Sequence, residues 1–343
     1  MTLTTKQRGK KAEVLKQDAT PKEILIIRGL ASLPAIYRFP EVVPTLDEAQ
    51  AYCKRLAQSH YENFHVASWF LPNRVRPHFH AISAYYRISH DLSDKIDDTA
   101  VALAMLDLWE EELDACYKGR VHHPVFVALA ETIQACSIPK EPFADLLTAF
   151  RHDQKVMRYA TMEDLLAYCR YSANPLGRLV LYATGGADEE RFRLTDATCT
   201  ALQLANFWQD VREDYARGRV YLPQQDMEFF HVSDEIIAEG IATPEFRGLM
   251  RCEVEFTRGL FEEGLPLIGM ADHELAPNLD LLSRGGLEIL RAIEGQNYDV
   301  LSARQTISNS TKVGLAVWEV AKWALENTGS ALSRVIMNRL RME

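Results

Sequence analysis

Three oxygen-bearing side chains, Asn206, Asp210 and Asp214, stand four residues apart in the segment QLANFWQDVREDYARGRVYLPQ (203–224). Four residues along an α-helix correspond to roughly 400° of rotation and about 6 Å of rise. The three side chains therefore form a nearly straight polar stripe, which Gln203 extends by one turn. Acidic residues at this spacing usually lie on a solvated helix face and gain nothing from each other's charge. Because the opposite flank is apolar, the stripe can instead line a cavity, and both interpretations stay open at this point.

Another polar stripe, the first in chain order, occurs in the segment FHAISAYYRISHDLSDKIDD (79–98), so the stripe of Asn206, Asp210 and Asp214 is the second. On a helix, one contiguous face is formed by Arg87, His90, Asp91 and Asp94. The other face is largely apolar, as packing against a core requires. Lys95, Asp97 and Asp98 fit a solvated helix end.

Two helices with inward acidic stripes can face each other across a cavity, but their carboxylates repel unless cations lie between them. Carboxylate and amide oxygens select Mg²⁺ or Mn²⁺, and Mg²⁺ often completes its coordination shell with substrate phosphates. Arginines can then clamp a diphosphate, because the guanidinium fork matches phosphate oxygens. Such a site makes diphosphate a good leaving group, and an apolar, aromatic wall protects the carbocation left behind. This chemistry suits the ionisation of prenyl diphosphates.

Composition narrows the class of protein. The chain has 343 residues, of which 47% are hydrophobic and 25% charged, and its net charge is −10. That balance argues against a nucleic-acid partner, whose binding face would be basic. No apolar run approaches the roughly 18–20 residues that span a bilayer, and the N-terminus has no secretory signal pattern. Six scattered cysteines without a C-x-x-C pair are typical of reduced thiols in a cytoplasmic protein.

The elements that carry the stripes are helices. Helical periodicity predicts segments near 46–60, 75–98, 99–117, 123–136, 141–158, 162–184, 193–216, 233–240, 244–268, 276–296, 311–326 and 329–340. Alternating strand patterns are scarce, so the sequence predicts an all-α fold, a single-domain helical bundle around a central cavity. We expect a partly mobile N-terminal extension over 1–45, the helical domain over 46–326 and a C-terminal helix or tail over 327–343.

Four segments together resemble the squalene/phytoene synthase family, the trans-isoprenyl head-to-head synthases. They are ENFHVASWFLPNRVRPHFHAISAYYRISHDLSD, YCRYSANPLGRLVLYATG, QLANFWQDVREDYARGRVYLP and SRGGLEILRAIEGQNYDVL, and the resemblance covers about 48–305. The phrases ENF, SANPLGRLVL and RGGLEILRAIE are most similar to the hydroxysqualene synthase branch of bacterial hopanoid synthesis. The resemblance implies the isoprenoid-synthase fold and a prenyl diphosphate substrate.

Site roles follow from the same resemblance, position by position. It implies catalytic roles for Asp91, Asp94, Asp210, Asp214 and Tyr168. It implies substrate binding by His60, Arg87, Gln203, Arg219, Tyr221 and Arg284. It implies metal binding by Asp94, Asn206, Asp210, Asp214 and His90. Gly177 matches the small-residue helix that flanks the prenyl channel.

Two residues depart from the family pattern in the first motif. The family usually opens it with Asp and the resembling branch closes it with Glu, but this chain has His90 and Lys95. A neutral imidazole is a poor Mg²⁺ ligand, and a lysine reduces the negative charge that attracts metal. Either the first metal site is weaker here, or His90 donates to phosphate or carries a proton.

The resemblance predicts the reaction as Mg²⁺-dependent ionisation of presqualene diphosphate with water capture to give hydroxysqualene, Mn²⁺ being an alternative metal and NADPH not expected. One alternative is condensation of two farnesyl diphosphates to presqualene diphosphate, squalene or a related C30 product. A second is a non-catalytic family member that acts as an assembly or scaffold protein. We expect a cytoplasmic protein without a nucleic-acid partner. Peripheral membrane contact and association with neighbouring enzymes of the squalene pathway stay open.

Overall fold

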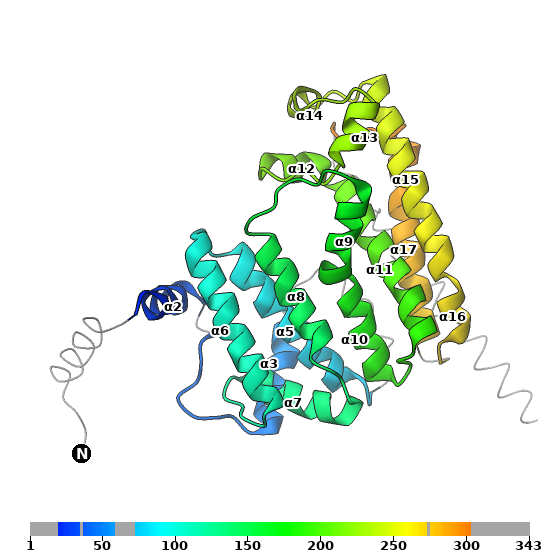
Figure 1. The fold of residues 1–343 in the computed structure, drawn as a ribbon. Coiled ribbons are helices and arrows are strands. Elements are labelled where there is room, and N and C mark those ends of the chain that lie inside the picture. The colour runs from blue at the N-terminus through cyan, green and yellow to red at the C-terminus, as the bar shows by residue number, and fades with distance from the viewer. Residues whose placement is uncertain (1–19, 35–36, 59–72, 273–274, 303–343) are drawn as a thin grey trace, which may run out of the picture. The chain divides into compact units, whose positions relative to one another are not determined.

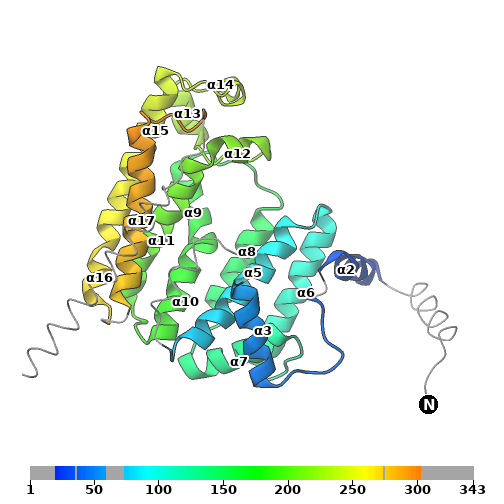
Figure 2. The ribbon, with the colours of Figure 1, turned by 180° about the vertical axis from the view of Figure 1, so that it is seen from behind.

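The computed structural model describes residues 20–34, 37–58, 73–272 and 275–302 (Figures 1 and 2). Within these ranges the chain is helical and has no strand, apart from one isolated bridge between Arg158 and Val220. The all-α prediction is therefore confirmed. The helices predicted over 311–326 and 329–340 lie outside the described residues, as does His60.

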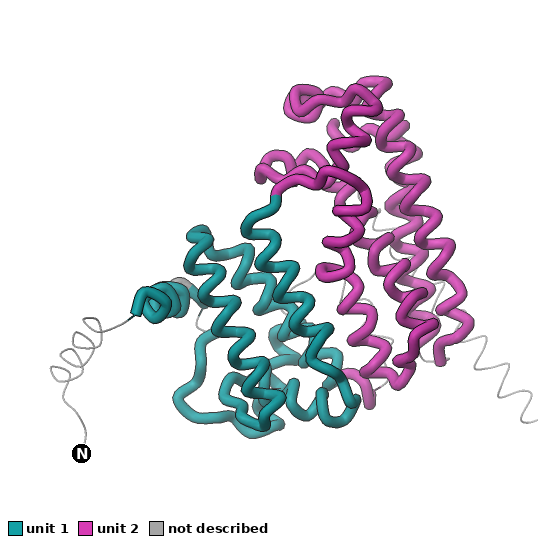
Figure 3. Tube along the Cα trace, viewed as in Figure 1, with its two compact units in different colours: residues 1–60, 77–156 teal, residues 61–76, 157–343 magenta. Residues whose placement is uncertain are grey.

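The chain folds into two compact units, which are coloured separately in Figure 3. Unit 1 comprises residues 1–60 and 77–156, and unit 2 comprises residues 61–76 and 157–343. The predicted central cavity and the domain boundaries at 46 and 326 stay predictions.

Unit 1 is built around α5. Its helices are α2 (Pro21–Ser32), α3 (Leu46–Gln58), α5 (Arg76–Asp94), α6 (Thr99–Tyr117), α7 (Pro124–Cys136) and α8 (Glu141–His152). The fully buried Tyr85 of α5 contacts the rings of Trp109, Phe126 and Phe143. Its hydroxyl donates to the carbonyl of Phe143 at 3.0 Å, and the indole N–H of Trp109 donates to Ser89 Oγ at 3.0 Å. The aromatic core thus leaves neither polar tip without a partner, as burial requires.

The predicted N-terminal extension contains a helix. Helix α2 begins with a complete capping box, in which Thr20 accepts from the Glu23 amide and Glu23 accepts from the Thr20 amide, and Pro21 occupies the first helical position. Helix α2 packs against α6. The following segment carries Tyr37, whose side chain is buried in unit 1. The described residues before position 46 therefore belong to unit 1.

Unit 2 is built around α11. Its helices are α9 (Met162–Ser172), α10 (Asn174–Thr184), α11 (Glu189–Gln209), α12 (Val211–Ala216), α13 (Gln224–Phe229), α14 (Asp234–Glu239), α15 (Pro244–Gly264), α16 (Pro266–Met270) and α17 (Ala276–Gly295). Helices α9, α10, α15, α16 and α17 all pack against α11. Glycines allow these close approaches. A Cβ on Gly177 of α10 would lie 2.5 Å from Thr195 Oγ1, and one on Gly264 of α15 would lie 2.0 Å from Thr198 Oγ1.

Three of the predicted helices are each divided in two. Pro175 and Pro266 follow the ends of α9 and α15, because proline lacks the amide hydrogen that would continue a helix. The predicted helix over 193–216 ends at Gln209 and restarts at Val211. Asp210 between them has φ −105° and ψ 14°, the bridge region that residues at active sites often adopt. The predictions of single helices over 162–184, 193–216 and 244–268 were therefore wrong at these breaks.

Neighbouring glycines in α17 allow a test of the packing in unit 2. A Cβ on Gly286 would lie 2.2 Å from Phe261 Cζ, and that ring is fully buried, whereas a Cβ on Gly285 would meet no atom within 4 Å. We expect Gly286→Ala to lower the free energy of unfolding by about 1–3 kcal/mol through overpacking. Gly285→Ala should raise it by up to about 1 kcal/mol through helix propensity. Thermal and urea unfolding of both variants measure the difference, and equal stabilities would contradict this packing.

Candidate active site

The second polar stripe of the sequence lies along α11 and α12 in unit 2. Gln203, Asn206, Asp210 and Asp214 are all partly exposed, while Phe207 and Trp208 between them are buried. The indole N–H of Trp208 donates to Thr257 Oγ1 of α15 at 2.7 Å. Helix α11 is thus fixed in rotation by its buried side, and the polar stripe faces away from the α15 contact.

The helix break at Asp210 does not interrupt the hydrogen bonding of the stripe. The amide of Asp210 donates to the carbonyl of Asn206 at 3.0 Å, and the amide of Asp214 donates to the carbonyl of Asp210 at 2.8 Å. The i, i+4 relation that the sequence predicted is therefore kept across the junction. Asn206, Asp210 and Asp214 stay on consecutive turns.

The two carboxylates of this stripe repel each other. Burial raises the pKa of Asp214 to about 6, and the negative charge of Asp210 adds to that rise, while Arg217 and Arg219 oppose it. A carboxyl group with a pKa shifted in this way is destabilised when ionised. A divalent cation between the two groups would remove that penalty. The donor set of two carboxylates and the Asn206 amide has the hard oxygen chemistry that Mg²⁺ and Mn²⁺ prefer.

The loop after α12 returns the chain to this stripe. Gly218 has a φ of 79°, the left-handed conformation that glycine adopts readily, and the amide of Arg219 then donates to the carbonyl of Asp214 at 2.9 Å. The amide of Val220 donates to the carbonyl of Met157 at 2.8 Å. The turn therefore places the backbone of Arg219 directly beside the acidic stripe, and its substrate-binding role stays a prediction.

An aromatic cluster borders the stripe. The ring of Tyr221 stacks on Phe207 with centroids 3.6 Å apart and planes at 9°, and Tyr168 of α9 contacts both rings. Tyr159 stacks on Tyr221 at 5.9 Å and contacts Tyr168. Two predicted site residues, Tyr168 and Tyr221, are thus brought together from distant parts of the sequence. Stacked rings present π-faces that can stabilise a cation.

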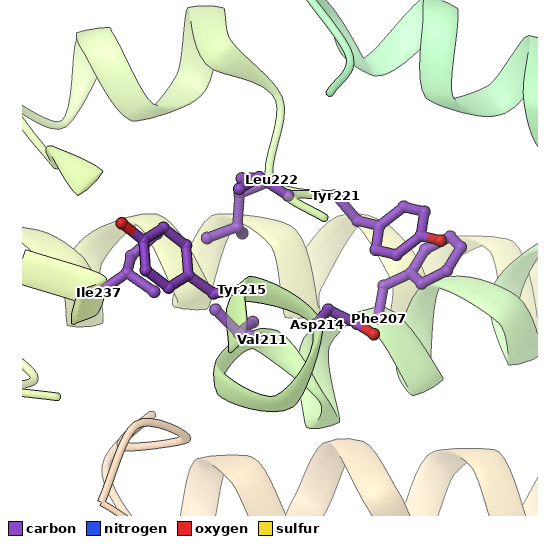
Figure 4. Close-up of a pocket in the computed structure, with 8 residues that line it drawn as sticks. Phe207, Val211, Asp214, Tyr215, Tyr221, Leu222 and Ile237 are labelled. Carbon is purple, nitrogen blue, oxygen red and sulfur yellow. The ribbon is translucent and has the colours of Figure 1, made fainter. Parts of the chain in front are cut away.

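A small pocket of about 220 Å³ opens at this cluster (Figure 4). It is lined by Phe207, Val211, Asp214, Tyr215, Val220, Tyr221, Leu222 and Ile237. Figure 4 shows Asp214 beside Phe207, with the Tyr221 ring parallel to the Phe207 ring. Asp214 is therefore the acidic group at the edge of an otherwise apolar and aromatic lining.

Arg284 of α17 is oriented by an ion pair. Its Nε donates to Asp280 Oδ1 at 2.8 Å, one turn earlier on the same helix, and Asp280 is buried. The Arg284 side chain itself is 47% exposed. The buried Asp280 therefore orients the guanidinium, and the substrate-binding role of Arg284 stays a prediction.

The first polar stripe lies on α5 in unit 1, and its central carboxylate is buried. Asp91 Oδ2 accepts from Tyr37 Oη at 2.5 Å and from Lys95 Nζ at 2.7 Å. Its Oδ1 lies 3.4 Å from Arg87 Nε and 3.5 Å from His90 Nδ1. Burial acts to raise the pKa of Asp91, but the contacts with His90, Lys95, Tyr37 and Arg87 outweigh it and hold the pKa well below its usual range.

Some expectations for this stripe need correction. Lys95 is not simply solvated, because its ammonium is committed to Asp91. Asp98 is not a merely solvated residue either, since its side chain accepts from the amides of Ala100 and Val101 and caps α6. Asp94 is exposed, which suits a ligand. Tyr37 was missed because it lies 54 residues before Asp91, and no local spacing links the two.

Among the described residues, no group of three or more His, Cys, Asp or Glu side chains is close enough to hold a metal ion. The ligand set of Asp94, Asn206, Asp210, Asp214 and His90 stays a prediction. In the same part of the chain, no helix has the length and apolarity needed to cross a membrane.

Comparison with known proteins defines the class of protein. Residues 57–311 match the squalene/phytoene synthase family, so the chain belongs to that family. The family condenses prenyl diphosphates head to head, and this chain is an enzyme of that prenyltransferase type. The family expected from the sequence is thereby confirmed.

Three proteins similar to this chain are a squalene synthase, a dehydrosqualene synthase and a phytoene synthase. A solved squalene synthase, HpnC from Alicyclobacillus acidocaldarius, is 43% identical, with a TM-score of 0.71 and coverage of 79% of this chain and 99% of that one. A dehydrosqualene synthase solved with a ligand is 26% identical, with a TM-score of 0.74 and coverage of 81% and 97%. The 15-cis-phytoene synthase of Synechococcus elongatus is 28% identical over 297 residues, which is 83% of this chain and 96% of that protein.

The repulsion at Asp214 generates a pH-dependent prediction for the metal-free protein. Because the folded pKa of about 6 exceeds the unfolded value, stability is lost as pH rises from about 4 to 6, and the loss is complete above that range. Asp214→Asn removes this loss of stability, because asparagine does not ionise. We expect the variant to be more stable than the parent by about 1–2 kcal/mol at pH 7.5 in EDTA, after allowance for partial exposure, and by nothing near pH 4.

Urea unfolding at pH 4, 6 and 7.5 measures this difference. Glu228→Gln on α13 makes the same change of net charge at an exposed position and should show no such pH dependence. An Asp214→Asn variant that is less stable than the parent at pH 7.5 would contradict the repulsion.

Proposed function

We propose that this enzyme ionises presqualene diphosphate and that water captures the rearranged cation to give hydroxysqualene, with release of diphosphate. The observation that carries the proposal is the stacked Phe207–Tyr221 pair beside the Asp210–Asp214 repulsion. The carboxylates of Asp210 and Asp214 require cations and can face a diphosphate through them. The stacked rings of Phe207 and Tyr221 offer π-faces to a carbocation.

The first step is ionisation of the substrate, and different residues act on different parts of the diphosphate. The C–O bond to the diphosphate breaks, and its electron pair leaves with the diphosphate. Mg²⁺ bound by Asn206, Asp210 and Asp214 would neutralise charge that develops on the diphosphate oxygens. Arg219, Arg284 and Gln203 would bind those oxygens through charge-assisted and neutral hydrogen bonds, with Arg284 positioned by Asp280.

The second step is capture of the cation by water, and the aromatic cluster controls how much water reaches it. Tyr159, Tyr168, Phe207 and Tyr221 would hold the cation against π-faces and restrict bulk water. One water then adds its oxygen to the rearranged allylic cation and loses a proton. This ending needs a polar opening beside the cation and no hydride donor. The 43% identity with a squalene synthase and the sequence resemblance to the hydroxysqualene branch support the C30 endpoint.

Condensation of two prenyl diphosphates is the alternative, favoured by the phytoene synthases among the relatives. The two reactions differ in substrate, because condensation starts from farnesyl or geranylgeranyl diphosphate. Products from each substrate, with and without NADPH, therefore separate them.

For the product, we expect presqualene diphosphate to yield a C30 secondary allylic alcohol that carries one solvent oxygen and does not change when NADPH is added. Mass spectrometry of products formed in ¹⁸O-water measures this. Squalene that appears only with NADPH would refute the proposal, as would a product without solvent oxygen.

For the metal site, Asp210→Asn should lower turnover by about 10²-fold or more, because it removes one charged ligand while keeping size and polarity. Folding stability should not fall, since one repelling charge is lost. Steady-state kinetics at saturating Mg²⁺, with circular dichroism as the folding check, measure both. Turnover close to that of the parent would remove Asp210 from the metal site.

A further inference from the structure

A cation–anion–cation stripe is formed by Arg87 and Asp91 on α5 and by Lys95, which directly follows the last residue of that helix. Successive members are four residues apart, and the Lys95 amide donates to the Asp91 carbonyl at 3.1 Å, so the three residues lie one turn apart. The Lys95 ammonium lies 2.7 Å from one oxygen of Asp91, and the Arg87 guanidinium lies 3.4 Å from the other oxygen. Both cations are therefore held within a few ångströms of a single carboxylate.

The charges of this stripe are unequally exposed. The Asp91 side chain is 1% exposed, whereas that of Arg87 is 28% exposed and that of Lys95 is 45% exposed. The negative charge is inside, and the two positive charges reach the surface. Tyr37 covers the carboxylate further by donating to the same oxygen as Lys95. Arg87, Asp91 and Lys95 together therefore carry one net positive charge, with the exposed carboxylate of Asp94 next to Lys95 in the chain.

This arrangement leaves no room for a divalent cation at Asp91. An ammonium and a phenol already occupy Oδ2, and a guanidinium and an imidazole face Oδ1. A metal ion bound there would lie beside two fixed positive charges, and Mg²⁺ also retains several waters that need space. Asp91 therefore acts on its neighbours rather than on a metal.

We propose that Lys95 is a diphosphate-binding residue, which acts with Arg87 on the substrate diphosphate without a metal ion between them. Asp91 is the positioning residue, since its buried carboxylate holds the Arg87 guanidinium on one oxygen and the Lys95 ammonium on the other. A guanidinium fork and an ammonium point charge are complementary donors to phosphate oxygens. The inference rests on the prenyl diphosphate substrate of the proposed function, and it does not depend on which product forms.

Binding of inorganic pyrophosphate in EDTA tests this without turnover. Isothermal titration calorimetry should show metal-independent binding by the parent chain, weakened about tenfold in Lys95→Met and in Lys95→Gln. Lys95→Gln can keep a hydrogen bond to Asp91 while it removes the charge, so it separates binding from local structure. Lys95→Arg should retain most of the affinity, and Lys118→Met, the same charge change at an exposed position after α6, should retain all of it.

The proposal would be overturned if the parent chain did not bind pyrophosphate in EDTA, or if the parent and Lys95→Gln bound it with equal affinity. A non-hydrolysable farnesyl thiodiphosphate distinguishes substrate from released product. Equal losses for both ligands support substrate binding, whereas a loss for pyrophosphate alone would make Lys95 a contact of the product only and reject the proposal as stated. Because product identity is not measured, failure of hydroxysqualene formation would leave these results unchanged.

Discussion

Repulsion between Asp210 and Asp214 is the constraint around which unit 2 is arranged. The two carboxylates are partly buried on consecutive turns, and burial raises the pKa of Asp214 to about 6. Such a pair persists only if other contacts fix the helices that carry it. The Trp208–Thr257 hydrogen bond and the glycine contacts of α10, α15 and α17 provide that rigidity. The core therefore stabilises a site that is unfavourable without its ligand, a known feature of functional sites.

The aspartates of the two motifs differ in how their negative charges are compensated. In the second motif, arginines counter the repulsion only in part and the carboxylates stay accessible. In the first motif, Lys95 and Tyr37 both donate hydrogen bonds to the buried carboxylate of Asp91. A family motif can thus be present in sequence while its central carboxylate is buried and bonded to other side chains of the chain. The departures at His90 and Lys95 gain a physical meaning only from this geometry.

Local periodicity accounts for what could be predicted. The all-α class and the Asn206–Asp210–Asp214 stripe depend on interactions within about one turn, and spacing reveals these directly. The proline breaks at Pro175 and Pro266 were readable in principle, because both residues interrupt otherwise continuous patterns. The break at Asp210 has no such marker. The Tyr37–Asp91 hydrogen bond and the contact of Tyr168 with Tyr221 join residues about 50 positions apart, so no spacing rule could find them.

The loop that carries Arg219 and Tyr221 is tied to the segment before α9 by backbone hydrogen bonds. Val220 donates to Met157, Gln224 to Tyr159 and Gln225 to Ala160. Each of these bonds pairs one position with one other, so adding or deleting a residue on either side would shift the register of Tyr221 against its aromatic partners. Over evolution, these two segments should keep a constant length even where their residues change. Insertions should instead accumulate in turns without such cross-links, such as the one around Gly185 between α10 and α11.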